Sequence, residues 1–139
     1  MFKSILVGLD GSHHALKAAK FAADIARLTK AALWVVVCYD PVPTYLGEPY
    51  RQQAINARLK FTDDILRPAL EAIGSIPGEL KTEALEGQPA EVILNVAEVR
   101  DIDLIVMGVR GLGRLAGLIL GSQSQKVVAN ASCPVLLVR

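Results

Sequence analysis

Five of the chain's 11 glycines lie in one stretch, GVRGLGRLAGLILGSQS, at residues 108–124. A glycine inside a helix costs about 1 kcal/mol relative to alanine, so this apolar segment is a poor helix. A glycine-rich backbone can instead close around a phosphate group. A helix beginning near Ser122 would add unpaired N–H groups and the positive end of its dipole. The hydroxyls of Ser122 and Ser124 are further donors. The segment therefore predicts a site for the phosphates of a nucleotide.

Two common nucleotide motifs do not describe this segment. The chain has no G-x4-G-K-[ST] sequence, which excludes a P-loop. The letters from Gly111 to Ala116 match G-x-G-x-x-A, but they follow the fourth predicted strand rather than the first. The acidic residue that a dinucleotide fingerprint needs about 20 residues later is also missing, because Ser132, Cys133 and Pro134 stand there.

The elements that position these residues alternate between strands and helices. Short apolar runs predict buried strands, and longer segments of helical periodicity lie between them. Ser12 is expected to cap the first helix, whose alanines at positions 15, 19, 22 and 26 form a face that packs closely on a sheet. In the second helix Ile55, Leu59, Leu66, Leu70 and Ile73 keep helical spacing, and Pro68 is expected to bend or break it. The predicted strands are residues 4–9, 33–39, 80–85, 104–107 and 135–138, and the other helices begin near Pro89 and Ser122.

This alternation predicts a single α/β domain over residues 1–139, with a doubly wound, Rossmann-like parallel sheet covered by helices on both faces. In such sheets a ligand lies beyond the carboxyl ends of the strands, where the winding reverses. The first strand ends at Asp10 and Gly11, and the fourth ends at Gly108. If these strands are neighbours, Asp10 and the glycine segment share one crevice.

Composition narrows the class of protein. Hydrophobic residues make up 52% of the chain and aromatic residues 5%, which favours an aliphatic core. A net charge of +1 indicates neither nucleic acid nor an anionic membrane as partner. The apolar runs are too short to span a bilayer, and the first residues do not form a signal peptide. Cys38 and Cys133 lack metal-ligand spacing and are expected to be reduced and buried, in a cytoplasmic protein.

The pattern Gly108-x2-Gly111-x9-Gly121-Ser122 resembles the G-x2-G-x9-G-[ST] motif of the ATP-binding universal stress proteins. The resemblance covers essentially the whole chain, through SILVGLDGS, VVCYDPVP, GQPAEVI, DLIVMGVRG and SCPVLLV. It implies a five-stranded, doubly wound domain similar to adenine nucleotide α-hydrolases. It also implies a homodimer joined through the last strand, and a crevice for ATP, or ADP or AMP, with magnesium. Val109 and Gly113 depart from the motif, because serine is usual at both positions.

Carried over by position, the resemblance assigns a role to each part of the crevice. Asp10 contacts the adenosine end, and Leu9 and Cys38 offer backbone or packing contacts to adenine. Met107 and Gly108 line the ribose side. The phosphates are surrounded by Arg110, Gly111, Gly121, Ser122, Gln123 and Ser124.

Other interpretations remain open at this point. Asp10 and Ser122 are also good capping residues, Arg110 could be a solvated charge, and His13 and His14 are expected at the surface. The favoured hypothesis is a nucleotide-dependent regulatory module of the stress response that acts on an unidentified protein partner. One alternative is a constitutive dimeric interaction module, suggested by the apolar residues 112, 115 and 118–120. Another is a slow ATP hydrolase or self-phosphorylating protein, although no second carboxylate or general base is evident.

Overall fold

A five-stranded parallel sheet forms the centre of the protein in the computed structural model, which describes residues 1–109 and 121–139. The strand order is β3-β2-β1-β4-β5, and each neighbouring pair is parallel. The winding therefore reverses between β1 and β4, which pair directly from Ile5 opposite Leu104 to Val7 opposite Val106. The strands are β1 (Ser4–Leu9), β2 (Ala32–Tyr39), β3 (Leu80–Glu86), β4 (Leu104–Gly108) and β5 (Val135–Val138).

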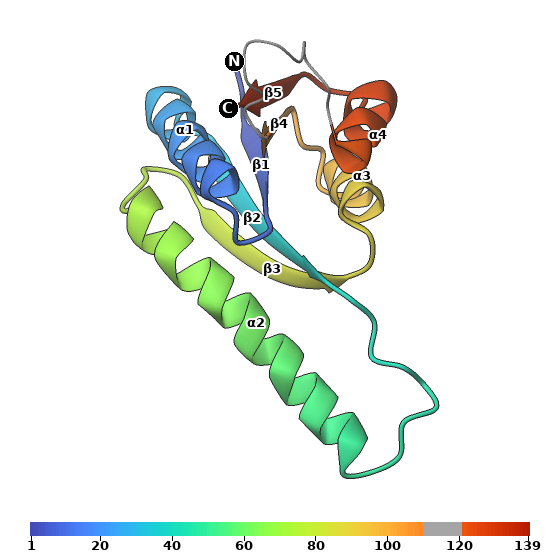
Figure 1. Cartoon of the computed structure of the whole chain (residues 1–139). Helices are drawn as coiled ribbons and strands as arrows, with labels where there is room; N and C mark the ends of the chain where they lie inside the picture. The colour runs from blue at the N-terminus through green and yellow to red at the C-terminus, as the bar shows by residue number, and fades with distance from the viewer. Residues whose placement is uncertain (110–120) are drawn as a thin grey trace, which may run out of the picture.

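Helices cover both faces of the sheet, which confirms the predicted doubly wound fold (Figure 1). On one face lie α1 (His13–Thr29) and α2 (Tyr50–Ile73), and on the other lie α3 (Pro89–Val99) and α4 (Ser122–Asn130). Pro89 occupies the first turn of α3, where its missing N–H costs nothing. All the predicted strands and helices form, with boundaries that differ by about a residue at several ends.

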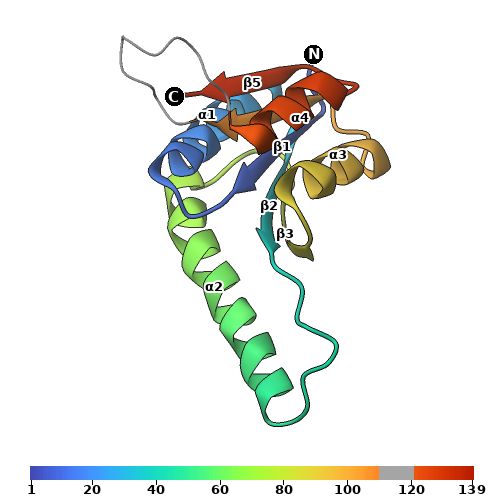
Figure 2. The same ribbon diagram turned by 45° about the vertical axis from the view of Figure 1, so that its right-hand side comes forward.

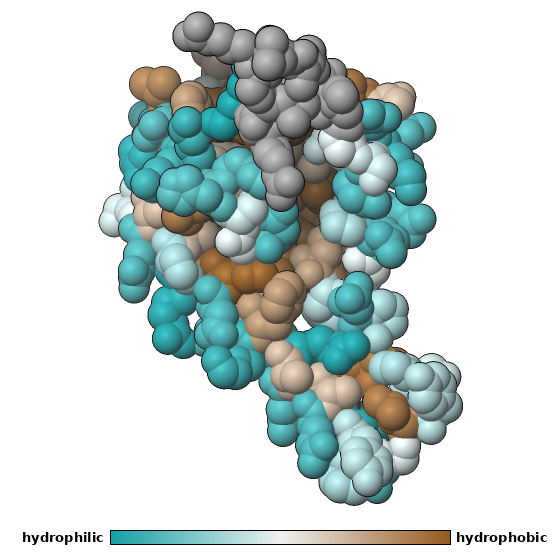
Figure 3. Space-filling view, viewed as in Figure 1, coloured by the Kyte–Doolittle hydropathy of each residue, from teal (hydrophilic) through white to brown (hydrophobic). Residues whose placement is uncertain are grey.

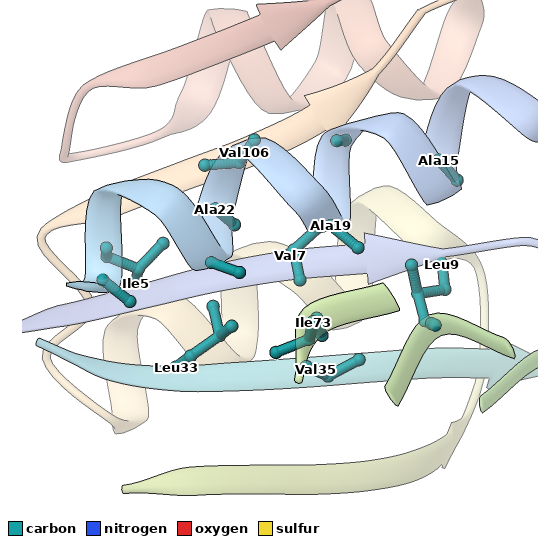
Figure 4. Packing of buried hydrophobic residues seen from close by; sticks show 14 of the residues in the cluster. Ile5, Val7, Leu9, Ala15, Ala19, Ala22, Leu33, Val35, Ile73 and Val106 are labelled. Carbon is teal, nitrogen blue, oxygen red and sulfur yellow. The ribbon is translucent and has the colours of Figure 1, made fainter. Parts of the chain in front are cut away.

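The first helix lies close to the sheet because its inner face is made of alanine. Ser12 caps α1 by accepting a hydrogen bond from the N–H of Ala15 at 3.2 Å. Figure 4 shows Ala15, Ala19 and Ala22 packed over Ile5, Val7 and their neighbours in the sheet. The charged residues of α1 at positions 17, 20, 24 and 27 lie on the exposed side, as their spacing predicts.

The second helix continues through Pro68 without a break, and Pro68 itself is exposed. Among the residues that keep helical spacing, Leu59 is 62% exposed. The reason is that the amino-terminal half of α2 extends past the sheet, as both ribbon views show (Figures 1 and 2). Helical periodicity therefore continues beyond the part of α2 that has a sheet beneath it.

The cysteines are free, as predicted, but both are half-buried rather than buried. No helix within residues 1–109 and 121–139 is long and apolar enough to cross a membrane.

Candidate functional site

A cavity of about 350 Å³ lies at the carboxyl ends of β1, β2 and β4, where the winding of the sheet reverses. Hydrophobic residues form a band down the middle of the face seen in Figure 3, between hydrophilic groups on either side. The amino-terminal ends of α1, α3 and α4 all contribute to the cavity wall. It is lined by eight of the predicted site residues: Leu9, Asp10, Cys38, Met107, Gly108, Gly121, Gln123 and Ser124.

Of the other three predicted site residues, one does not line the cavity and two lie outside the described residues. Ser122 is exposed and does not line the cavity. Arg110 and Gly111 lie outside the described residues, as do the apolar residues 112, 115 and 118–120 that suggested an interaction surface. The structure therefore describes residues 108–109 and 121–124 of the glycine segment, but not residues 110–120.

Asp10 belongs to the tight turn that joins β1 to α1. Its Oδ1 accepts a hydrogen bond from the N–H of Ser12 at 2.9 Å, and Gly11 has a φ of +83°. Glycine adopts this left-handed backbone without the steric cost that other residues meet. The turn leads from β1 into α1, which packs back on the sheet, and Asp10 lines the cavity. Asp10 thus both closes a turn and lines the cavity.

Gly108, which lines the cavity, is also required by the packing of a helix against the sheet. A Cβ atom placed on Gly108 would lie 2.3 Å from the carbonyl oxygen of His14 and 2.6 Å from the nitrogen of Ala15. Both atoms belong to the backbone of α1, so neither can rotate away. The missing side chain lets the first turn of α1 rest directly on the end of β4.

Gly121 is in the opposite situation, because none of the described residues would contact a Cβ atom placed there. Its φ of −61° and ψ of 158° are also open to any residue. Gly121, not Ser122, is the N-cap of α4, and glycine has no side chain with which to cap the helix. The first N–H groups of a helix have no partner within it. The amino terminus of α4 therefore presents backbone donors beside the cavity.

Gln123 connects the two helices on this side of the sheet. Its Oε1 accepts a hydrogen bond from the N–H of Ala90, in the first turn of α3, at 2.9 Å. The residue at the N-cap of α3, Gln88, makes no capping bond with its side chain. Gln123 takes over that task from a different helix and fixes the ends of α3 and α4 relative to each other. Its amide nitrogen carries two further N–H donors.

Cys38 places a backbone carbonyl at the wall of the cavity. The N–H of Gly87 donates to the carbonyl of Tyr39, so the backbone groups of Tyr39 point toward β3. Successive residues of a strand direct these groups to opposite sides, so the carbonyl of Cys38 points toward β1. β1 ends at Leu9, which pairs with Val37. The Cys38 carbonyl therefore extends past the end of β1, and Cys38 lines the cavity there.

The thiol of Cys38 is a packing group. Burial raises its pKa to about 11, so the thiol stays protonated at neutral pH. Only the thiolate is a strong nucleophile or metal ligand.

Seven residues of the cavity wall were not among the predicted site residues, and two of them, His14 and Phe61, carry large side chains with possible roles toward a ligand. His14 was expected at the surface together with His13; His13 is exposed, but His14 is half-buried and lines the cavity. Its position just before the buried Ala15 and four residues before the buried Ala18 was the available signal. Phe61 of α2 also lines the cavity, although α2 follows a different strand from the two that define the crevice. Local sequence pattern carried no signal for Phe61.

The wall holds few charges. Asp10 is the one carboxylate that lines the cavity among residues 1–109 and 121–139. Within the same residues, no group of three or more histidine, cysteine or acidic side chains is placed to hold a metal ion. The described part of the site is therefore apolar, with backbone donors at one end, a backbone carbonyl at the other and one carboxylate between.

The fold and the position of the cavity define a doubly wound α/β domain with a ligand crevice at the switch point of its sheet. The universal stress protein family model matches residues 1–139. The chain is 51% identical to a universal stress protein of Thermus aquaticus over 139 residues, covering all of both chains. It is 36% identical to one of Methanocaldococcus jannaschii over 145 residues, covering all of this chain and 83% of the other.

Solved structures agree with this assignment. A universal stress protein of Lactobacillus plantarum has a TM-score of 0.79 at 29% identity, covering 99% of this chain and 98% of that one. A universal stress protein in complex with cAMP has a TM-score of 0.68 at 28% identity, covering 99% and 97%. The chain belongs to the universal stress protein family.

Proposed function

We propose that this universal stress protein binds an adenine nucleotide in the crevice and acts as a nucleotide-dependent regulatory module. The observation that carries the proposal is the arrangement of the wall, with uncapped N–H groups of α4 at one end and the Cys38 carbonyl at the other. The N–H groups of α4 suit a phosphate, and the Cys38 carbonyl suits a base that donates a hydrogen bond. The cavity of about 350 Å³ lies within the range of small-molecule sites, which runs from about 300 to 1,000 Å³.

The Cys38 carbonyl favours adenine over guanine. Adenine carries an exocyclic amino group, which donates a hydrogen bond, where guanine carries an oxygen, which accepts one. The Cys38 carbonyl, which extends past the end of β1, can accept a hydrogen bond from the amino group of adenine. It repels the oxygen of guanine. The apolar neighbours Leu9, Ile93 and Met107 provide contacts for the ring. The complex of a related universal stress protein with cAMP, itself an adenine nucleotide, supports the same ligand class.

Regulation requires that the nucleotide bind two states of the protein with different affinity. The crevice lies where three helix ends meet, and Gln123 already links two of them. We propose that ATP, with magnesium held mainly by the phosphates and Asp10, changes the surface around these helix ends, which a protein partner recognises. Hydrolysis is not proposed as the main function, because Asp10 is the lone carboxylate of the described wall and phosphoryl transfer needs several positioned charges.

Titration calorimetry tests the ligand class. We expect ATP and AMP, with magnesium, to bind the wild-type protein with dissociation constants in the micromolar range. GMP should bind more weakly, because guanine presents an oxygen to the Cys38 carbonyl where adenine presents its amino group. If neither ATP nor AMP binds at millimolar concentration, the proposal fails. Equal affinity for AMP and GMP would remove the role assigned to the carbonyl.

We also propose that the protein forms a homodimer through β5. This strand lies at the edge of the sheet, and Val135, Leu136 and Leu137 are half-buried rather than covered. An exposed apolar edge strand is a template for pairing with another chain. The N–H of Val109 donates to the carbonyl of Val138, so the backbone groups of Val138 point toward β4. By alternation those of Leu137 and Val135 point away from the sheet.

Amide hydrogen exchange distinguishes this dimer from other assemblies. The amide of Leu136 should be protected in any folded state, because it points toward β4. The amides of Val135 and Leu137 should be protected only when β5 of a second copy pairs with them, and should lose protection on dilution. Light scattering should give twice the 14.9 kDa of one chain at micromolar concentration. A monomer at that concentration, or a dimer with rapidly exchanging Val135 and Leu137, would contradict the proposal.

A further inference from the structure

A half-exposed aromatic side chain stands at the mouth of the crevice. Phe61 is 48% exposed and lines the cavity. Single exposed apolar residues are common on protein surfaces and by themselves need no explanation. Phe61 differs from its neighbour Leu59, which is 62% exposed on the same helix and does not line the cavity. The feature that sets Phe61 apart is therefore its position at the cavity, not its exposure.

Contacts on both sides along α2 fix the position of Phe61. One helical turn later, Ile65 packs against the turn after β1, because a Cβ atom placed on Gly11 would lie 3.2 Å from Ile65 Cγ1. One turn earlier, the guanidinium of Arg58 donates to the carbonyl oxygens of Asp40 at 2.9 Å and Pro41 at 3.1 Å, just after β2. Phe61 lies on α2 between these two contacts, so it is held next to the carboxyl ends of β1 and β2.

The end of β2 is also where the Cys38 carbonyl lies. A flat aromatic ligand that donates a hydrogen bond to this carbonyl would occupy the space between the strand ends and α2. Phe61 is the one phenylalanine, tyrosine or tryptophan of the cavity wall within the described parts of the chain. Aromatic rings stack favourably on nucleic-acid bases and bury apolar surface when they do so.

We propose that Phe61 is the residue on which the base of the bound nucleotide stacks, so that α2 takes part in ligand recognition. This inference rests on the proposed function, since it assigns a residue to the base end of the same crevice. Stacking demands a planar side chain, whereas simple apolar cover does not. The two roles therefore differ in which substitutions they tolerate.

The test is a calorimetric titration of AMP into the wild type and four variants, F61A, F61L, F61W and L59A. We expect F61A to weaken AMP binding by about tenfold or more, F61L to weaken it nearly as much, and F61W to retain it. L59A is the matched control, because it removes an exposed side chain of the same helix outside the cavity, and should bind as the wild type does. Thermal unfolding of each variant checks that all remain folded.

The outcomes distinguish failure of the proposed nucleotide binding from failure of the stacking role alone. If the wild type binds no adenine nucleotide, the proposed function fails and this inference fails with it. If the wild type binds AMP and F61A binds it equally well, the stacking role alone is overturned. If F61L binds as tightly as the wild type, Phe61 provides apolar cover and not a stacking surface. A loss in L59A equal to that in F61A would assign the effect to the helix rather than to Phe61.

Discussion

Replacement of Gly108 by alanine should destabilise the protein by about 3 kcal/mol, a large share of the stability of a domain of this size. The added Cβ would lie 2.3 Å from the carbonyl oxygen of His14, 2.4 Å from its carbonyl carbon and 2.6 Å from the nitrogen of Ala15. Because all three are backbone atoms, relief requires α1 to move away from β4. That movement would open the closely packed alanine layer between α1 and the sheet (Figure 4).

Urea unfolding measures this effect directly. The midpoint for Gly108→Ala should fall while the slope stays the same, since the folded state loses stability rather than compactness. Gly47→Ala is the matched control, because no atom of residues 1–109 or 121–139 lies within 4 Å of a Cβ placed on Gly47, and it should change stability by less than about 0.5 kcal/mol. A Gly108→Ala variant as stable as the wild type would show that α1 does not rest on β4 as described.

Replacement of Gly121 by valine should weaken binding of ATP and AMP by about 100-fold while leaving the protein folded. The backbone of Gly121 is in an extended conformation and has open space around it, so valine meets no described atom. It would, however, stand over the uncapped N–H groups of α4, where the proposed phosphates approach. Loss of donors to a charged group costs more than loss of an ordinary hydrogen bond.

The control for this variant is Gly47→Val, the same change at a glycine that also has open space but lies in the loop between β2 and α2. Valine is a poorer N-cap residue than glycine, so Gly121→Val should lose about 1 kcal/mol of stability and remain folded. Calorimetric titration of both variants compares their affinities. Unchanged affinity in Gly121→Val would show that the amino terminus of α4 is not a phosphate site.

Elements were predicted well because their signals are local. The apolar run of β1 and the alanine face of α1 each encode a strand or a helix within a few residues. Helical spacing alone does not reveal that Leu59 is exposed, since its burial depends on how far the sheet extends beneath α2. Pro68 was expected to bend or break α2, and at this exposed position the helix continues without a break.

The candidate site shows the same difference between features with a local sequence signal and features that depend on tertiary packing. Asp10 and Gly108 were expected to share a crevice if the first and fourth strands were neighbours, and β1 pairs directly with β4. The reason for Gly108 was missed, because the approach of His14 to β4 depends on tertiary packing. The bond from Gln123 to α3 joins residues 33 positions apart, and Phe61 reaches the crevice from a helix outside the motif. Neither relation leaves a pattern in one sequence.

An adenine nucleotide that occupies the crevice at the switch point of the sheet should be visible in the backbone amide chemical shifts of the wild-type protein while AMP is added. We expect saturable changes at residues 8–11, 38, 107–109 and 121–124. We also expect none around a second cavity lined by residues 97–98 and 130–133. Changes centred on that second cavity, or no changes at millimolar AMP, would contradict binding in the crevice.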